Sequence, residues 1–217
     1  MSEIKLLHSG GNGVILAAPT NNPASDVTFK LPQADGTSGQ VLTTNASGQL
    51  AFATVTGFTP EADGYRLTTD FSGSANPISS NWERNDSTWE GTGYLGSSLI
   101  TQSSGIWTFA KTGWYYFYLQ HDAQIGGGNS DGFNQFIASI STDSGSNYTN
   151  FCENDGWFGD NVSTKYMVKS SSALIKVANA STYRIKIEQA AGSSATTTKG
   201  SSTKLRTGFI LLRIGDA

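Results

Sequence analysis

Hydrophobic and polar residues alternate along much of the chain, most regularly between Ile106 and Ile125. After a turn at Lys111–Gly113, where the glycine is expected at a positive φ, the odd-numbered positions 115 to 125 are apolar except His121 and would share one face of a strand. The opposite face begins aromatic and becomes polar, through Trp114, Tyr116, Tyr118, Gln120, Asp122 and Gln124. A strand of a soluble sandwich needs only one apolar face. The aromatic half of the second face therefore predicts a cover, and a second copy of the chain is our candidate.

Further strand patterns recur from residue 65 onward, separated by turn residues. Because no segment shows a sustained helical period with caps, we predict an all-β, antiparallel sandwich with essentially no helix. The predicted strands are Tyr65–Phe71, Trp82–Arg84, Leu99–Gln102, Ile106–Phe109, Trp114–Gln124, Gln135–Thr142, Thr164–Lys169, Ala173–Val177, Tyr183–Gln189 and Thr203–Ile214.

The last of these strands is apolar on both faces. Phe209 and Leu211 oppose a second apolar set, Ile210, Leu212 and Ile214. A strand buried on both sides lies centrally or in a subunit interface. We therefore predict a self-association interface formed by Trp114, Tyr116, Tyr118, Ile210, Leu212 and Ile214. The alternative is an internal cover, such as the N-terminal segment folding back over the sheet.

Residues 1–57 differ from the remainder because they contain neither Trp nor Tyr and are interrupted by glycine and proline. Their strand-like runs are too short to bury much surface alone, which predicts a stem whose core is shared between chains. These runs are Val14–Leu16, Val27–Leu31, Gln40–Thr43 and Leu50–Phe52. We expect two parts, a stem for attachment and trimerisation over 1–57 and a globular domain over 58–217.

Composition excludes several functional classes. The 217 residues carry 14 basic and 17 acidic side chains, a net charge of −3, so no basic patch predicts nucleic-acid binding. No apolar run approaches the length of a membrane span, and the N-terminus lacks a secretory signal pattern. The single cysteine, Cys152, excludes a disulfide framework and is expected to be a buried thiol.

No catalytic signature is present, so we expect a protein that is not an enzyme. The two histidines, His8 and His121, lack metal-ligand spacing, and His121 is expected to be a satisfied, partly buried side chain. A depolymerase would need paired acids on a long repetitive solenoid, and no such repeat occurs. No cofactor is expected.

Two loops, Gly126–Gly132 and Cys152–Asn161, are the best candidates for recognition. The second combines carboxylates, amides and glycine in an oxygen-rich spacing that suits calcium, although the closing glutamate of an EF-hand is missing, and an ordinary polar loop is the alternative. Aromatic residues among short polar ones are typical of recognition loops, or else they turn inward and close the ends of the sandwich. The candidate binding residues are Trp82, Trp89, Asn129, Asp131, Glu153, Asp155, Trp157, Phe158 and Asp160.

The string LPQADGTSGQVLTTNASGQLAF, from Leu31 to Phe52, resembles a segment of bacteriophage tail-fibre and related appendage proteins. That resemblance covers about a tenth of the chain and implies a thin trimeric stem before a larger domain. A glycine-rich hairpin of an unrelated β protein is the alternative.

The region from Tyr65 to Ile214 resembles the jelly roll of the complement globular-head and tumour-necrosis-factor superfamily. The resemblance rests on the aromatic turn and strand TGWYYF, the strand ending FIASISTDSGSNY, the pair ALIKV and ANASTYRIKI, and the closing TGFILLRI. It departs at Asn179–Thr182, where that family commonly has Gly-Asp. It implies a ten-stranded jelly roll, a homotrimer around a three-fold axis, and recognition rather than catalysis.

Together these patterns predict a bacteriophage virion protein, assembled in the host cytoplasm and exposed on the particle. The stem would bind other virion proteins, and the trimeric knob would bind a host-surface polysaccharide or protein. The alternatives are a capsid-decorating or head fibre without a receptor, and a lectin-like module.

Overall fold

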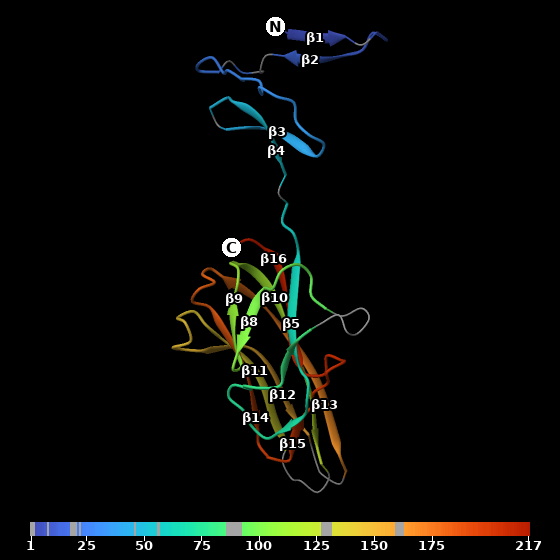
Figure 1. Cartoon of the computed structure of the whole chain (residues 1–217), viewed down its shortest axis with the longest axis vertical. Helices are drawn as coiled ribbons and strands as arrows, with labels where there is room; N and C mark the ends of the chain where they lie inside the picture. Colours follow the sequence, from blue (N-terminus) through green and yellow to red (C-terminus); the bar gives the residue numbers. More distant parts are fainter. Residues whose placement is uncertain are drawn as a thin grey trace. The chain divides into compact units, whose positions relative to one another are not determined.

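The computed structural model describes the chain except residues 1–2, 8, 18–20, 22, 46, 56, 86–92, 127–131 and 159–162. Within the described residues there are strands, turns and extended segments but no helix, as predicted. The chain divides into two compact units, Met1–Gly57 and Phe58–Ala217 (Figure 1).

The N-terminal unit contains two separate antiparallel hairpins. One joins β1 (Glu3–Leu7) to β2 (Gly13–Ala17), and the other joins β3 (Gln40–Thr44) to β4 (Leu50–Thr54). The predicted strand Val27–Leu31 is wrong, because only Lys30 pairs, through a single parallel bridge to Gln49 beside β4. Apolar side chains of this unit are exposed along the second hairpin and the segments beside it; they are Val27, Phe29, Leu31, Val41, Leu42, Phe52 and Val55.

The C-terminal unit is a sandwich of two antiparallel sheets. The seven-stranded sheet runs β6-β15-β10-β16-β5-β7, with β13 on the other side of β10, and the five-stranded sheet runs β12-β11-β14-β9-β8. The first sheet consists of β5 (Glu61–Leu67), β6 (Phe71–Ser72), β7 (Trp82–Arg84), β10 (Gly113–Ile125), β13 (Lys165–Val177), β15 (Thr196–Thr198) and β16 (Gly208–Gly215). The second consists of β8 (Ile100–Ser103), β9 (Ile106–Phe109), β11 (Phe133–Ser141), β12 (Thr149–Trp157) and β14 (Arg184–Ala191).

The aromatic strand β10 organises the sandwich. It pairs along its whole length with β13, from Gly113↔Val177 to Ile125↔Lys165, and on its other side with β16 and then β15. Its inward residues join a core that includes Trp107, which meets the ring of Phe209 edge-on at 5.0 Å between centroids. Aromatic pairs in such geometries add to the stabilisation from apolar burial.

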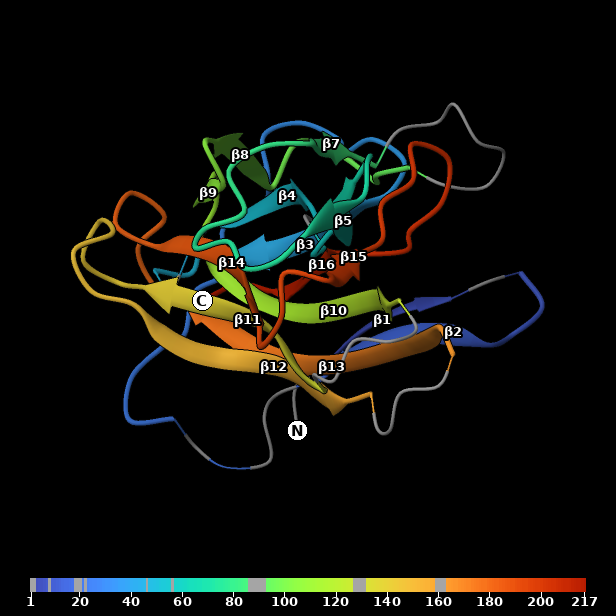
Figure 2. The same ribbon diagram turned by 90° about the horizontal axis from the view of Figure 1, so that it is seen from below.

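The edge strands of the two sheets, β12 and β13, lie side by side (Figure 2). The Cys152 Sγ and Ser171 Oγ atoms are 3.1 Å apart, and Asn154 Nδ2 donates to the Lys169 carbonyl at 3.4 Å. Side-chain contacts therefore close this edge of the sandwich where no backbone ladder joins the sheets.

Two of the predicted elements need correction. Cys152–Trp157 belongs to strand β12 rather than to a loop, because Cys152 and Asn154 alternate inward and the backbone pairs with β11. The patterns predicted as two strands, Thr164–Lys169 and Ala173–Val177, form the single strand β13, since the serines between them still pair with β10.

A turn at Lys111–Gly113 lies between β9 and β10, as the sequence predicted. Gly113 has the expected positive φ of 149°, and an added Cβ would lie 2.6 Å from the Gly215 carbonyl oxygen. The strands β9 and β10 nevertheless belong to different sheets. This turn carries the chain across the sandwich.

Candidate functional site

The outer face of the seven-stranded sheet, which points away from the core, carries a row of apolar side chains on three neighbouring strands. In the strand register, Tyr116 of β10 lies between Leu174 of β13 and Leu212 of β16, and Tyr118 lies beside Ile210. We call this set the outer apolar row: Trp114, Tyr116, Tyr118, Leu174, Ile210, Leu212 and Ile214.

Much of the outer apolar row is exposed to solvent. The exposed fractions are 64% for Leu174, 49% for Ile214, 40% for Trp114 and 38% for Leu212. The core side of the same strands is fully buried at Tyr115, Phe117, Leu119, Phe209 and Leu211. The predicted division of β10 and β16 into two faces is thus confirmed. A contiguous exposed apolar surface of this kind is typical of an interaction site.

Charged side chains pair at the start of β10 on the core side of the sheet, where Arg213 lies opposite Tyr115 and Glu61. Lys111 Nζ lies 2.5 Å from Glu61 Oε1, and Arg213 Nη1 lies 3.9 Å from Glu61 Oε2. The hydrogen bond from Lys111 lowers the pKa of Glu61 below its ordinary value. Tyr115, whose hydroxyl donates to the Lys111 carbonyl at 2.8 Å, is buried enough to raise its pKa to about 12. These contacts hold the end of β10 in place.

The outer face of the five-stranded sheet brings together several of the predicted binding residues. Trp157 on β12 lies opposite Phe133 on β11, and Asp155 lies opposite Gln135. The neighbouring Asp155 carboxyl, which hydrogen-bonds the protonated form of Glu153, raises the pKa of Glu153. Sequence reasoning missed Phe133 and Gln135, because their partners on β12 follow only from the strand register.

Two other predicted aromatic residues turn inward. Trp82 is half-buried against Trp107 and donates from Nε1 to the Ile78 carbonyl at 2.7 Å. Phe158 is buried in a small cluster with Ala123, Ile125 and Met167. Of the two readings that the sequence left open, inward packing holds for these two side chains. Trp157 instead points outward. Trp89, Asn129, Asp131 and Asp160 lie outside the described residues, as do His8 and most of the loop 126–132.

His121 and Cys152 are both buried. The His121 ring stacks on Phe136 at 4.6 Å between centroids, and its Nε2 lies 3.5 Å from Thr198 Oγ1. Its Nδ1 has no hydrogen-bond partner among the described residues. The expectation of a satisfied, partly buried histidine is therefore wrong on both points. Burial raises the pKa of the Cys152 thiol, so the reactive thiolate is disfavoured.

Among the described residues, no group of three or more His, Cys, Asp or Glu side chains is placed to hold a metal ion. Within the same residues, no helix is long and apolar enough to cross a membrane.

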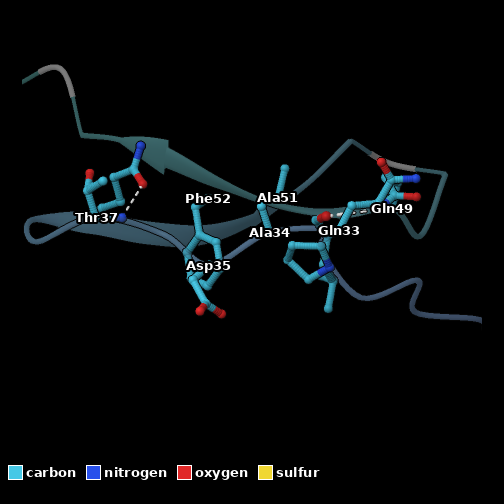
Figure 3. Close-up of a pocket in the computed structure, with 10 residues that line it drawn as sticks. Gln33, Ala34, Asp35, Thr37, Gln49, Ala51 and Phe52 are labelled. Carbon is cyan, nitrogen blue, oxygen red and sulfur yellow. Dashed lines mark hydrogen bonds between the residues drawn. The ribbon is translucent and has the colours of Figure 1, made fainter.

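The N-terminal unit has an open pocket of about 610 Å³ beside the β3–β4 hairpin (Figure 3). Phe52 forms part of its lining, and a Cβ on Gly36 would meet the Phe52 ring at 2.5 Å, so the ring packs directly on the glycine backbone. The Thr37 amide donates to Gln40 Oε1 at 2.8 Å. The lining residues are Pro32, Gln33, Ala34, Asp35, Thr37, Gln40, Gln49, Leu50, Ala51 and Phe52.

No protein-family model and no curated protein matches the chain. A solved structure similar to it is that of Eiger TNF from S. frugiperda, with a TM-score of 0.51 and 13% sequence identity over 73% of this chain and 96% of that chain. This likeness concerns the fold alone. The C-terminal unit thus has a jelly-roll fold like that of a tumour necrosis factor, as the resemblance of Tyr65–Ile214 implied.

Proposed function

We propose that this protein is a trimeric fibre of a bacteriophage virion, whose C-terminal unit adheres to the surface of the host cell. The outer apolar row is the single observation that carries the proposal. The exposed Leu174, Leu212 and Ile214 lie on neighbouring strands, and burying them against other copies removes this surface from water. The jelly-roll likeness supports the same assembly, because the resemblance noted from the sequence implies packing around a three-fold axis.

The N-terminal unit supports a shared core as well. A two-stranded hairpin alone is marginally stable in water, and the β3–β4 hairpin and its flanking segment expose Phe29, Leu31 and Phe52. Equivalent side chains of three copies would cover one another. The resemblance of Leu31–Phe52 to phage appendage proteins supports the assignment to a virion, where this unit would bind other virion proteins.

Adhesion would then be multivalent. Three copies of one weak site on each fibre raise the effective affinity for a repeating surface polymer without any new contact at a single site. The exposed Trp157 and its polar neighbours on the five-stranded sheet are the site that we assign to this contact.

Two measurements test the proposal. Light scattering after size exclusion should give a mass near three times the 23.0 kDa chain, and the purified protein should compete with virions for host cells. A monomeric mass would contradict the proposed trimer. A trimer that does not compete would contradict adhesion and favour a decorating fibre without a receptor.

A further inference from the structure

We propose that the outer face of the five-stranded sheet binds an uncharged glycan chain along a strip from Trp157 and Phe133 to a hollow beside Glu188. This inference rests on the proposed adhesion and names the ligand class of its site. The strip uses only described residues of β11, β12, β14 and the segment Ser74–Asn76.

The aromatic end of the strip provides two exposed rings, tilted by 48° to each other. The Trp157 side chain is 70% exposed, and a Cβ on Gly132 would lie 2.3 Å from its Nε1, so the indole lies directly over the glycine backbone. The Phe133 ring is 6.2 Å from it between centroids and is 38% exposed. The apolar face of a pyranose ring can stack on such aromatic faces and shield both from water.

The middle of the strip offers hydrogen-bonding groups suited to hydroxyls. Along β11 the next outward position is Gln135, which lies opposite Asp155, and its Nε2 donates to Glu153 Oε1 at 3.3 Å. Ionised carboxylates only accept hydrogen bonds, while an amide both donates and accepts. A sugar hydroxyl, which also does both, can pair with either group.

The other end of the strip is a hollow of about 320 Å³, lined by Ile137, Glu188, Ala190 and the segment Ser74–Asn76. Two backbone hydrogen bonds of 2.9 Å between Ala75 and Gln189 fix this segment against β14. From position 133 to position 137 of β11 is about 14 Å at the rise of an antiparallel strand. That length suits an extended chain of sugar units better than a single one.

The charges of this face favour an uncharged ligand. Glu153, Asp155 and Glu188 would repel an acidic polysaccharide. Two lysines offset part of this charge for a basic peptide, because Lys186 Nζ lies 3.1 Å from Glu188 Oε2 and Lys169 Nζ donates to the Asp155 carbonyl. A neutral chain that donates hydroxyl hydrogens matches the acceptors without a charge of its own.

Calorimetric titration of the full chain with neutral gluco-, galacto-, manno- and rhamno-oligosaccharides tests this proposal, with oligolysine as a separate probe. At least one neutral oligosaccharide should bind, and Trp157→Ala should weaken that binding about tenfold, as expected for loss of an aromatic anchor. Asp155→Asn should weaken it less. Tyr166→Ala, which removes an exposed aromatic from the other sheet, is the matched control and should leave it unchanged.

The proposal is overturned if none of the neutral oligosaccharides binds, if Trp157→Ala binds like the unmodified protein, or if only oligolysine binds. Because Trp157 is exposed, unchanged thermal unfolding of Trp157→Ala would show that its effect is local. If the full chain competes with virions but binds none of the oligosaccharides, the glycan proposal is contradicted and the proposed adhesion is not. Oligosaccharide binding without competition would contradict the proposed function instead.

Discussion

Asp63 and His121 show two ways in which this core holds a polar side chain. The Asp63 carboxylate is buried but accepts hydrogen bonds from Arg84 Nε at 2.7 Å and from the Leu99 amide at 2.9 Å. His121 is buried with one long contact and an unpartnered nitrogen. Burial disfavours the charged form of a histidine. The pKa of His121 is accordingly lowered to about 3, and the ring is neutral in the folded protein at neutral pH.

This depressed pKa predicts that the protein loses stability on mild acidification. Below pH 6.5 the unfolded chain protonates His121, whereas the folded chain does so only near pH 3. The unfolded state therefore binds more protons, and the free energy of unfolding falls by up to about 1.4 kcal/mol per pH unit within that window. Urea unfolding between pH 7 and pH 5, where most carboxylates stay ionised, should show this slope. His121→Gln should flatten it, and an equal slope in both proteins would refute the assignment.

At the scale of strands, the pairing register brings apolar residues from distant parts of the sequence together on one surface. Leu174 and Leu212 are far apart in the sequence, yet both lie beside Tyr116 in the seven-stranded sheet. Periodicity identified the outward residues of β10 and β16. It did not identify Leu174, because periodicity locates a strand without naming its neighbour.

Leu174→Glu and Leu212→Glu should separate the copies without unfolding them. Both side chains are exposed in the single chain, so the change costs the isolated fold little, whereas a carboxylate buried between copies is unpaired. Light scattering should show loss of the trimer with an unchanged circular dichroism spectrum. Thr101→Glu on β8, an exposed position of the other sheet, is the control and should remain trimeric. If the Leu212→Glu variant stays trimeric, the outer apolar row is not the interface between copies.

Much of the fold could be predicted from the sequence, and the reasons for the failures are physical. The strand Ile106–Phe109 was located to the residue, and β10 to within one residue at each end, because their apolar alternation is strong. Trp82–Arg84 was also located to the residue, although Trp82 is its one apolar side chain. Strand β12 was missed because its inward positions include Asn154, a polar residue satisfied by carbonyls of β10 and β13. Of the candidate binding residues, Trp157 is exposed and Phe158 buried. Their adjacency alone could not decide which one turned outward.

At the scale of the whole molecule, the two units differ in how they bury apolar surface. The described core clusters lie entirely within residues 67–211, in the C-terminal unit. The second hairpin of the N-terminal unit leaves Val41, Leu42 and Phe52 exposed. In the proposed trimer the first unit would share its core with partner copies, whereas the described core of the second unit is formed within one chain.

A fragment of residues 58–217 should consequently fold alone, and a peptide of residues 1–57 should not. We expect the fragment to unfold cooperatively and to keep the near-ultraviolet circular dichroism of the full chain, since its aromatic core is complete. The peptide should lack a β-strand spectrum at low concentration. A fragment that unfolds without cooperativity would mean that the first unit completes the core of the second.

Strand β16 lies between β10 and β5, so the last strand of the chain joins the first strand of the sandwich to its central one. Synthesis proceeds from the N-terminus, and β5 and β10 lack this common neighbour until residue 215 has left the ribosome. The pairing of β5 with β16 joins residues that are almost the whole unit apart in the sequence, and such a topology folds slowly. Until then β10 and β5 each keep an open edge, although β10 can pair with β13 and β5 with β7, and aggregation through these edges competes with folding. Premature termination shortly before β16 should yield an insoluble product rather than a slightly shorter knob.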